Sequence, residues 1–234
     1  MNSISVIIPV LNEAENIGFL LNYLTLHSST ASISEILVVD GGSTDGSQEI
    51  VSEISKTQPS IVLINSPKGR AKQMNLGASQ SNGTVLYFLH ADSIPPENFD
   101  QYILDATQNG SKTGCFKMKF DSNHWWLQLA GWFTQFNWKS CRGGDQSLFV
   151  DKTAFENLGC FNEDFVIYED NDLIYKLYEQ YDFEVLPYWL TTSSRRYQSN
   201  GVWVLQYHFW VIHLKKFFGA TPKTLEAYYL KYIH

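Results

Sequence analysis

The sequence of 234 residues predicts an α/β fold with a mostly parallel central sheet flanked by helices. Short apolar runs, such as 36–39 and 85–89, have the length and composition of buried parallel strands. Between them lie stretches whose apolar residues recur at helical spacing. Strands that alternate with helices in this way indicate a parallel sheet with right-handed crossovers. With 44% hydrophobic residues and no repeat or linker-like run, the chain is expected to form one continuous domain.

The first strand is predicted over 4–9 and the second is predicted to end at Asp40. Asn12 is expected to cap the helix between them, because Glu15 stands three residues later, at the spacing of a capping box. The buried face of this helix is predicted to consist of Ile17, Leu20, Leu21 and Leu24. Asp45 is expected to cap the second helix. The buried face of that helix is predicted to consist of Ile50, Val51 and Ile54.

Two further units complete the first half of the chain. A strand over 61–64 precedes a helix over 70–80, which is expected to end before Ser81-Asn82-Gly83. A strand over 85–89 precedes a helix that is expected to open at Pro95-Pro96. The apolar residues of this helix that share one face are Phe99, Tyr102, Ile103 and Ala106.

The second half is less regular. Residues 116–120 alternate apolar and basic side chains, which indicates a half-exposed strand. Further short strands are predicted over 147–150 and 183–186. An amphipathic helix is predicted from Trp126, Leu129, Ala130 and Phe133. Another helix is expected to start near Asp170 and to carry Leu173, Ile174, Leu177 and Tyr178.

Composition restricts the class of protein. A net charge of −7 argues against general nucleic-acid binding. Three widely spaced cysteines without metal-ligand spacing fit a reduced, cytoplasmic setting. Since a strand begins almost at once, we expect no signal peptide, and the absence of an apolar run of ~18 residues argues against a spanning helix.

Acidic residues follow two of the predicted strands and open a later helix. Asp40 and Asp92 come directly after apolar runs, and Glu169-Asp170 stand before the helical pattern of 173–178. Ligands of open α/β sheets bind outside the carboxyl ends of the strands. Because charge near a core is costly without a partner, these carboxylates indicate a metal ion, a ribose hydroxyl or a proton to be abstracted.

Five motifs in this order resemble the family 2 glycosyltransferases, whose fold is GT-A, a single Rossmann-like domain. The segments 5–13 (SVIIPVLNE), 39–46 (VDGGSTDG) and 69–78 (GRAKQMNLGA) match the family's first three blocks. His90-Ala91-Asp92 stands where the family carries Asp-x-Asp, and 169–173 (EDNDL) fits its base motif. The resemblance runs from about residue 4 to residue 177.

A narrower subgroup, linked to arsenosugar and organoselenium biosynthesis, is also similar. The segments that carry this likeness are 144–150 (GDQSLFV) and 194–197 (SRRY). The resemblance as a whole implies one domain over 1–234. Within it we expect a nucleotide-binding half (1–110), an acceptor and catalytic half (111–200) and a C-terminal amphipathic helical extension (201–234).

The resemblance also implies roles for the matching positions. The donor-binding residues would be Pro9, Leu11, Glu13, Asp40, Gly41, Arg70, His90, Ala91 and Asp92. Among them, Asp40 would bind uracil or ribose, Arg70 the base or phosphate side, and Asp92 a divalent metal on the diphosphate. Asp170 would be the general base, with Glu169 beside it. The residues expected to contact the acceptor or the sugar are Gly144, Asp145, Gln146, Arg195 and Arg196.

These residue types suit inverting glycosyl transfer. A positioned carboxylate can take the proton of the acceptor, and Mg²⁺ or Mn²⁺ on hard oxygen ligands can stabilise the departing diphosphate. Arg195 and Arg196 are candidates for further diphosphate contacts. His90 departs from the family because it replaces the first Asp of Asp-x-Asp. His90 could ligate the metal or bond to the sugar, or Asp92 could act alone; Asp92 is expected to carry most of the metal binding.

Structural explanations compete with several of these roles. Asp40 and Asp45 also suit turns and helix caps, which is the interpretation we prefer for Asp45 alone. Asp92 also suits a turn before Pro95, and Asp170 the first turn of a helix. A tight loop alone would equally explain the two glycines at 143 and 144. Arg195 and Arg196 could equally be solvated side chains on the protein surface. For Trp125, Trp126, Trp132 and Trp138, core or lid packing is preferred to a sugar platform.

The C-terminal segment 202–218 is aromatic and amphipathic and carries Lys215-Lys216 near its end. Packing over the core or a homodimer contact is the preferred interpretation. Peripheral contact with a membrane surface is the alternative, since aromatic residues and lysines suit that interface.

The sequence therefore predicts an inverting, metal-dependent glycosyltransferase that uses a nucleotide-sugar, with a UDP-sugar as donor and a small molecule as acceptor. A nucleotidyltransferase on a similar scaffold would instead cleave a nucleoside triphosphate and release pyrophosphate. A nucleotide-sugar sensor that lost its chemistry through His90 would bind donor without turnover. The retained acids at 169 and 170 count against the sensor.

Overall fold

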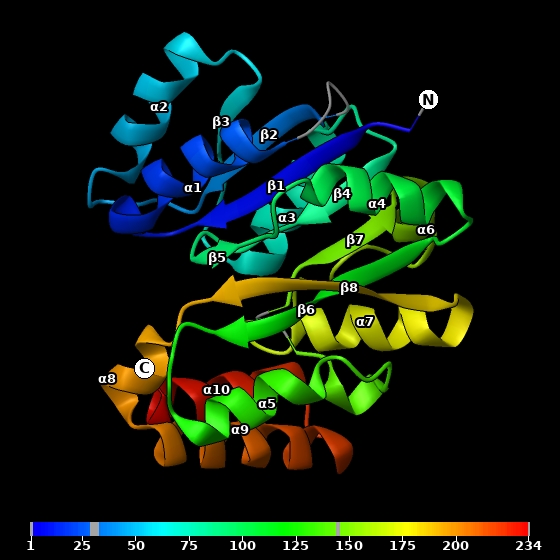
Figure 1. The fold of residues 1–234 in the computed structure, drawn as a ribbon. Coiled ribbons are helices and arrows are strands. Elements are labelled where there is room, and N and C mark those ends of the chain that lie inside the picture. Colours follow the sequence, from blue (N-terminus) through cyan, green and yellow to red (C-terminus); the bar gives the residue numbers. More distant parts are fainter. Residues whose placement is uncertain (1, 29–32, 144–145, 234) are drawn as a thin grey trace.

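A continuous eight-stranded sheet organises the described part of the chain, with helices on both of its faces (Figure 1). The computed structural model describes residues 2–28, 33–143 and 146–233. The strands are β1 (Ile4–Val10), β2 (Ile33–Asp40), β3 (Ile61–Asn65), β4 (Val85–Phe88), β5 (Ser93–Ile94), β6 (Thr113–Phe120), β7 (Leu148–Asp151) and β8 (Phe183–Thr192). The helices are α1 (Ala14–His27), α2 (Ser47–Thr57), α3 (Arg70–Gln80), α4 (Phe99–Gln108), α5 (Trp125–Phe133), α6 (Lys152–Asn157), α7 (Glu169–Gln180), α8 (Arg195–Asn200), α9 (Val202–Phe217) and α10 (Pro222–Tyr232), with a short 3₁₀ turn over Lys139–Cys141.

The strand order is β3-β2-β1-β4-β7-β6-β8-β5. The first four strands along the chain pair in parallel, as do β6 and β8. This confirms the predicted fold class. The second half departs from a purely parallel pattern, because β7 runs antiparallel to both of its neighbours, β4 and β6, and β5 runs antiparallel to β8.

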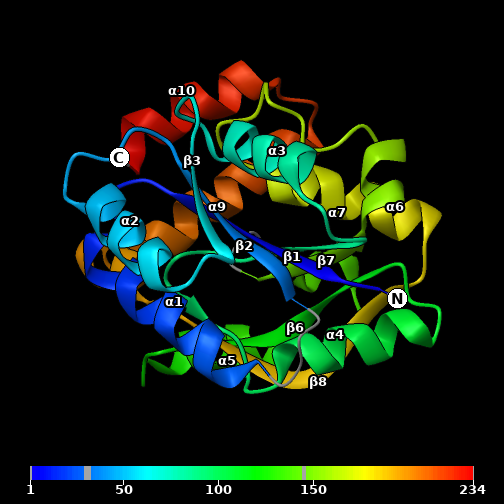
Figure 2. The ribbon, with the colours of Figure 1, turned by 90° about the horizontal axis from the view of Figure 1, so that it is seen from above.

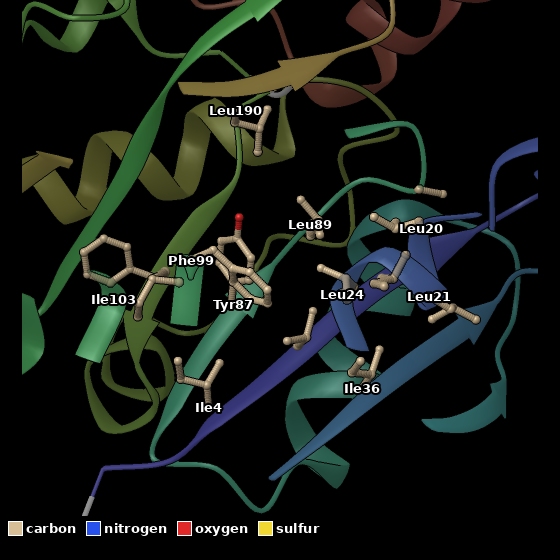
Figure 3. Close-up of a cluster of buried hydrophobic side chains, with 14 of the residues drawn as sticks. Ile4, Leu20, Leu21, Leu24, Ile36, Tyr87, Leu89, Phe99, Ile103 and Leu190 are labelled. Atoms are coloured by element: carbon tan, nitrogen blue, oxygen red, sulfur yellow. The ribbon is translucent and has the colours of Figure 1, made fainter. Parts of the chain in front are cut away.

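Both faces of the sheet are covered, which explains the continuous apolar strands. The core against α1, α2 and α4 includes Ile4, Leu20, Leu21, Leu24, Tyr87, Phe99 and Ile103 (Figure 3). A second core, against α3, α6 and α7, includes Ile7, Met74, Phe155, Leu173 and Leu177. Figure 2 shows α1 and α4 on one face of the sheet and α3 and α6 on the other. Each fully buried aliphatic or aromatic side chain contributes about 1.5–3 kcal/mol, so both layers stabilise the sheet edge described below.

A third core joins the C-terminal helices to the rest of the protein. Leu127 on α5 packs with residues of the loop before α7 and with residues of α8, α9 and α10. Its buried members are Leu127, Phe165, Tyr168, Tyr197, Leu205, Ile212, Leu225 and Ile233. One side of α9 therefore packs against the rest of the protein, as the preferred interpretation of 202–218 predicted.

The predicted cap of the first helix is wrong, and that of the second helix holds only in part. Asn12 does not cap α1, whose N-cap is Glu13; Asn12 has a φ of 56° and its Oδ1 accepts from the backbone N–H of Thr44. Asp45 stands one residue before Gly46, the N-cap position of α2, but its Oδ1 accepts from the N–H of Ser47, the first residue of α2, at 3.1 Å. Its Oδ2 accepts from the N–H of Ala14 at 2.9 Å, so Asp45 also caps α1. The two loops pair across the sheet edge, and a capping rule based on sequence distance does not include that contact.

Further differences concern the start of one helix and the exposure of aromatic side chains. The helix expected at Pro95-Pro96 begins at Phe99. On α5, Leu127 and Gly131 are buried instead of Phe133, which is 39% exposed. Core packing is also wrong for Trp125, Trp132 and Trp138, which are each about half exposed. Trp126 is partly buried, and its indole N–H donates to Gln206 Oε1 at 3.0 Å.

Candidate functional site

The loops that follow β1, β2 and β4 meet at one edge of the sheet. These strands are neighbours and run parallel, so their carboxyl ends lie together. Gly41 N–H donates to Val10 O at 2.9 Å, and Leu89 N–H donates to Ile7 O at 3.0 Å. The edge therefore brings together the sequence-predicted residues of 9–13, 40–41 and 90–92.

Asp40 is buried at this edge and is only 1% exposed. Its Oδ2 accepts from the N–H groups of Gly42 (2.8 Å) and Ser43 (3.0 Å) and from Gln48 Nε2 (2.7 Å). Its Oδ1 has no hydrogen-bond partner among the described residues. Because an unsatisfied buried carboxylate oxygen is costly, Oδ1 is suited to accept from a hydroxyl or N–H group of a ligand.

Gln73 links the ends of β1 and β2 next to Gly41, and it is not among the residues predicted from the sequence. It is buried on α3, and its Nε2 donates to Val10 O (2.8 Å) and Val39 O (2.7 Å). A Cβ on Gly41 would lie 2.9 Å from Gln73 Oε1, so the absence of a side chain at Gly41 permits this contact. The available signal was a glutamine between two buried positions of the helix, Ala71 and Met74.

Arg70 joins the start of α3 to the start of α7. Its Nε donates to Glu169 Oε1 and its Nη2 lies 2.8 Å from Asp170 Oδ2. The side chain of Glu169 is fully buried, whereas that of Asp170 is 11% exposed. Both acids lie in the first turn of α7, where the helix dipole favours negative charge. Arg70 was expected to face the donor, and the structure adds that it holds both acids.

Arg195 makes a second cationic link at the edge. Its Nη2 contacts Glu13 Oε1 and lies 3.3 Å from Asp92 Oδ2. The hydrogen bond to Glu13 raises the pKa of Arg195 despite partial burial, so the guanidinium stays charged. The β5–β8 pairing positions this residue, because Ser193 N–H donates to Asp92 O at 3.2 Å, two residues before Arg195.

The remaining predicted residues are those expected to contact the acceptor or the sugar, and the structure places them differently. Gln146 is buried and its Oε1 accepts from Gly143 N–H at 3.3 Å, while its Nε2 has no partner among the described residues. Gly144 and Asp145 lie outside the described residues. Arg196 is not brought to the edge: its Nη2 donates to Tyr229 on α10 at 2.5 Å, and its guanidinium lies near the ring of Phe209 on α9.

The residues at the edge fit a metal only together with a ligand. Within residues 2–28, 33–143 and 146–233, no group of three or more His, Cys, Asp or Glu side chains could hold an ion. Asp92 supplies one accessible carboxylate, with Arg195 beside it. Mg²⁺ is commonly held by one or two carboxylates plus substrate phosphates, and this donor set matches that arrangement.

Known proteins resemble this chain in sequence. The profile of glycosyl transferase family 2 matches residues 5–161. The glycosyltransferase AglE of Haloferax volcanii is 40% identical over 98 residues, which cover 41% of this chain and 32% of AglE. The succinoglycan biosynthesis protein ExoA of Rhizobium meliloti is 26% identical over 193 residues, which cover 74% of this chain and 57% of ExoA. An undecaprenyl-phosphate 4-deoxy-4-formamido-L-arabinose transferase of Photorhabdus laumondii is 31% identical over 49% of this chain and 37% of its own length. The chain thus spans about a third to somewhat over half of these relatives.

Solved structures share the fold. TarS 1–349 of S. aureus in complex with UDP has a TM-score of 0.68 at 20% identity, over 82% of this chain and 60% of that one. Another structure of the same TarS fragment has a TM-score of 0.65 at 19% identity, over 83% of this chain and 61% of that one. This likeness supports the GT-A architecture.

Proposed function

Because this chain belongs to glycosyl transferase family 2, we propose that it transfers a sugar from a nucleotide-sugar, a UDP-sugar, to a small-molecule acceptor with inversion. The observation that carries the proposal is the buried Asp40 carboxylate, whose Oδ1 has no partner among the described residues at the ligand edge of the sheet. The similar TarS structure that contains UDP supports the choice of donor.

In this proposal Asp40 accepts hydrogen bonds from the uracil or the ribose. Its other oxygen is already used to fix the loop, so the free oxygen is held in one direction before ligand arrives. Pro9 and Leu11 line the nucleotide pocket, and Gly41 with Gln73 forms its base.

The diphosphate would lie by Asp92 and Arg195. Asp92 would hold a Mg²⁺ or Mn²⁺ ion, with His90 next to it; such an ion supplies Lewis-acid stabilisation of the leaving diphosphate. Arg195 adds a charged, forked donor to the diphosphate at the same place. It thereby compensates in part for the stabilisation of the diphosphate that is lost when His90 replaces a metal-binding acid. Arg195 must then leave Glu13 or share its donors with the ligand.

Asp170 is proposed as the general base that takes the proton of the acceptor. Glu169 is fully buried and bound to Arg70, so it suits an anchoring role, whereas Asp170 is partly exposed. Adjacent helix residues point in different directions, and only one of them can face the acceptor.

The subgroup linked to arsenosugar and organoselenium biosynthesis is proposed on the segments 144–150 and 194–197, and it favours a small acceptor. Of the proposed acceptor residues in the described chain, Gln146 precedes β7, whose Leu148 pairs with the last residue of β4, and Arg195 lies beside Asp92.

A panel of nucleotides and nucleotide-sugars, with and without Mn²⁺, tests the proposal by thermal shift. A ligand that binds only the folded state raises the melting temperature, so UDP and one UDP-sugar are expected to do so. Product analysis then separates the alternatives: a transferase releases UDP, a nucleotidyltransferase releases pyrophosphate, and a sensor releases neither.

A further inference from the structure

Helix α9 has two apolar sides, and only one of them faces the protein. Leu205 and Ile212 are buried in the third core. On the other side, large apolar residues recur every three or four positions and are between 49% and 83% exposed: Trp203, Tyr207, Trp210, Leu214 and Phe217. Residues at this spacing lie on one side of a helix, and the stripe extends over roughly 20 Å at 1.5 Å per residue.

Neighbouring aromatic residues widen the stripe. Trp125 on α5 is 59% exposed, and its ring centroid lies 5.7 Å from that of Trp203. Phe218, at the end of α9, is also largely exposed. We refer to Trp125, the five residues of the stripe and Phe218 as the α9 face. Figure 1 places α9 at the outer edge of the molecule, with α5 and α10 between it and the sheet. Contiguous exposed apolar surface of this kind marks an interaction site.

The charge of the C-terminal segment that contains α9 is opposite in sign to that of the whole chain. Residues 201–234 contain four lysines and one glutamate, although the net charge of the protein is −7. Lys215 and Lys216 lie at the end of α9, with their amines over the rings of Tyr228 (5.2 Å) and Phe165 (4.6 Å). Lys223 and Lys231 on α10 are exposed. The segment that carries the apolar stripe is thus positively charged, with Lys215 and Lys216 off the stripe's own side of α9.

We infer that the α9 face lies on the surface of an anionic lipid bilayer, with α9 parallel to the membrane plane. Trp and Tyr side chains suit the headgroup region, and nearby lysines are attracted to anionic lipids. A second copy of the chain fits less well, because a two-fold interface would place this positively charged region against itself. Among the described helices, none is long and apolar enough to cross a membrane, so the contact is peripheral.

Vesicle co-sedimentation tests the inference, with phosphatidylcholine alone and phosphatidylcholine mixed with phosphatidylglycerol. The wild type is expected to bind the mixed vesicles more strongly, and added salt is expected to weaken that binding. Leu214→Ser/Phe217→Ser is expected to reduce binding at least about tenfold, because two apolar side chains no longer enter the interface. The matched control is Phe19→Ser/Leu26→Ser, which removes two exposed residues of the same types from α1 and is expected to bind as the wild type does.

Two measurements on the wild type keep the test independent of how the variants fold. Tryptophan emission is expected to shift to shorter wavelength with mixed vesicles and to be quenched by brominated lipid, because Trp203 and Trp210 lie on the α9 face. Absence of vesicle binding, or equal loss in both double variants, would overturn the inference. Ultracentrifugation without lipid that finds a dimer, lost only in Leu214→Ser/Phe217→Ser, would assign the face to a second copy instead.

Discussion

Arg70 Nη2 lies 2.8 Å from Asp170 Oδ2, which joins two residues that are far apart in the sequence. The same guanidinium binds the buried Glu169 through its Nε. One cation therefore fixes the start of α7 against the start of α3 at the carboxyl edge of the sheet. The two acids differ in exposure: the side chain of Glu169 is fully buried, whereas that of Asp170 is 11% exposed.

The Asp170→Asn variant is expected to reduce sugar transfer at least about a hundredfold while nucleotide affinity stays the same, because the donor does not need the base. Glu169→Gln is expected to have the milder effect on transfer but to lower the melting temperature, since it weakens a buried pair with Arg70. Transfer rates, UDP calorimetry and thermal melts of both variants check this. Normal turnover by Asp170→Asn with an inactive Glu169→Gln would exchange the two roles; full activity in both would move the base elsewhere, with Asp145 the next candidate.

The Asp92→Asn variant keeps the size of the side chain and removes its charge. Transfer is expected to fall at least about a hundredfold, because stabilisation of the leaving diphosphate is lost. Steady-state rates at several Mn²⁺ concentrations are the measurement. Asp172→Asn is the matched control, since Asp172 pairs with Lys176 on α7. Full wild-type activity in EDTA would show that the metal assignment is wrong.

Gly41→Ala tests the support under Asp40. The new Cβ would lie 2.9 Å from Gln73 Oε1 and displace an amide that donates to two strand carbonyls. We expect a loss of roughly 1–3 kcal/mol in the free energy of unfolding, together with weaker UDP binding. Urea titration and calorimetry measure both. Gly143→Ala, where an added Cβ meets nothing within 4 Å, should leave stability nearly unchanged; equal losses in the two variants would argue against this packing role.

Glu35 predicts a pH dependence of stability. Burial acts to raise the pKa of this carboxyl, but hydrogen bonds from Asn82 and Ser5 outweigh it and hold the pKa below its ordinary value. The resulting stability is present above the ordinary glutamate pKa of about 4.3 and is lost as pH falls through the lowered value. Glu35→Gln should therefore be less stable than the wild type at pH 7, with a gap that narrows in acid. Urea unfolding at neutral and acidic pH checks the narrowing, and a constant gap would contradict it.

Local sequence patterns predicted the first half of the fold well. The buried face of α1 consists of the four residues expected from spacing, and the helix over 70–80 has the predicted bounds. The antiparallel placement of β7 between β4 and β6 was not predicted, because strand order depends on contacts between distant segments.

In the candidate site, too, positions set by the local sequence could be predicted, whereas contacts between distant segments could not. The position of Asp40 at a strand end could be predicted from the sequence, and Asp40 is buried there. The hydrogen bonds of Gln73 to β1 and β2, the Arg70 contacts with α7 and the Arg195 link between Glu13 and Asp92 all join separate elements. Such pairings follow from tertiary packing, which no short motif specifies. For the same reason, neighbouring Arg195 and Arg196 could not be separated before their opposite surroundings were known.

Calorimetric titration of UDP into the wild type, Asp40→Ala and Asp45→Ala tests the central claim of a nucleotide-sugar site most directly. Asp40 has a buried oxygen with no partner among the described residues, which we propose binds the nucleoside, whereas Asp45 accepts from Ala14 N–H at the start of α1. We expect the wild type and Asp45→Ala to bind UDP, and a folded Asp40→Ala to lose measurable binding. A wild type that does not bind UDP, or an Asp40→Ala that binds with unchanged affinity, would contradict the proposed donor site.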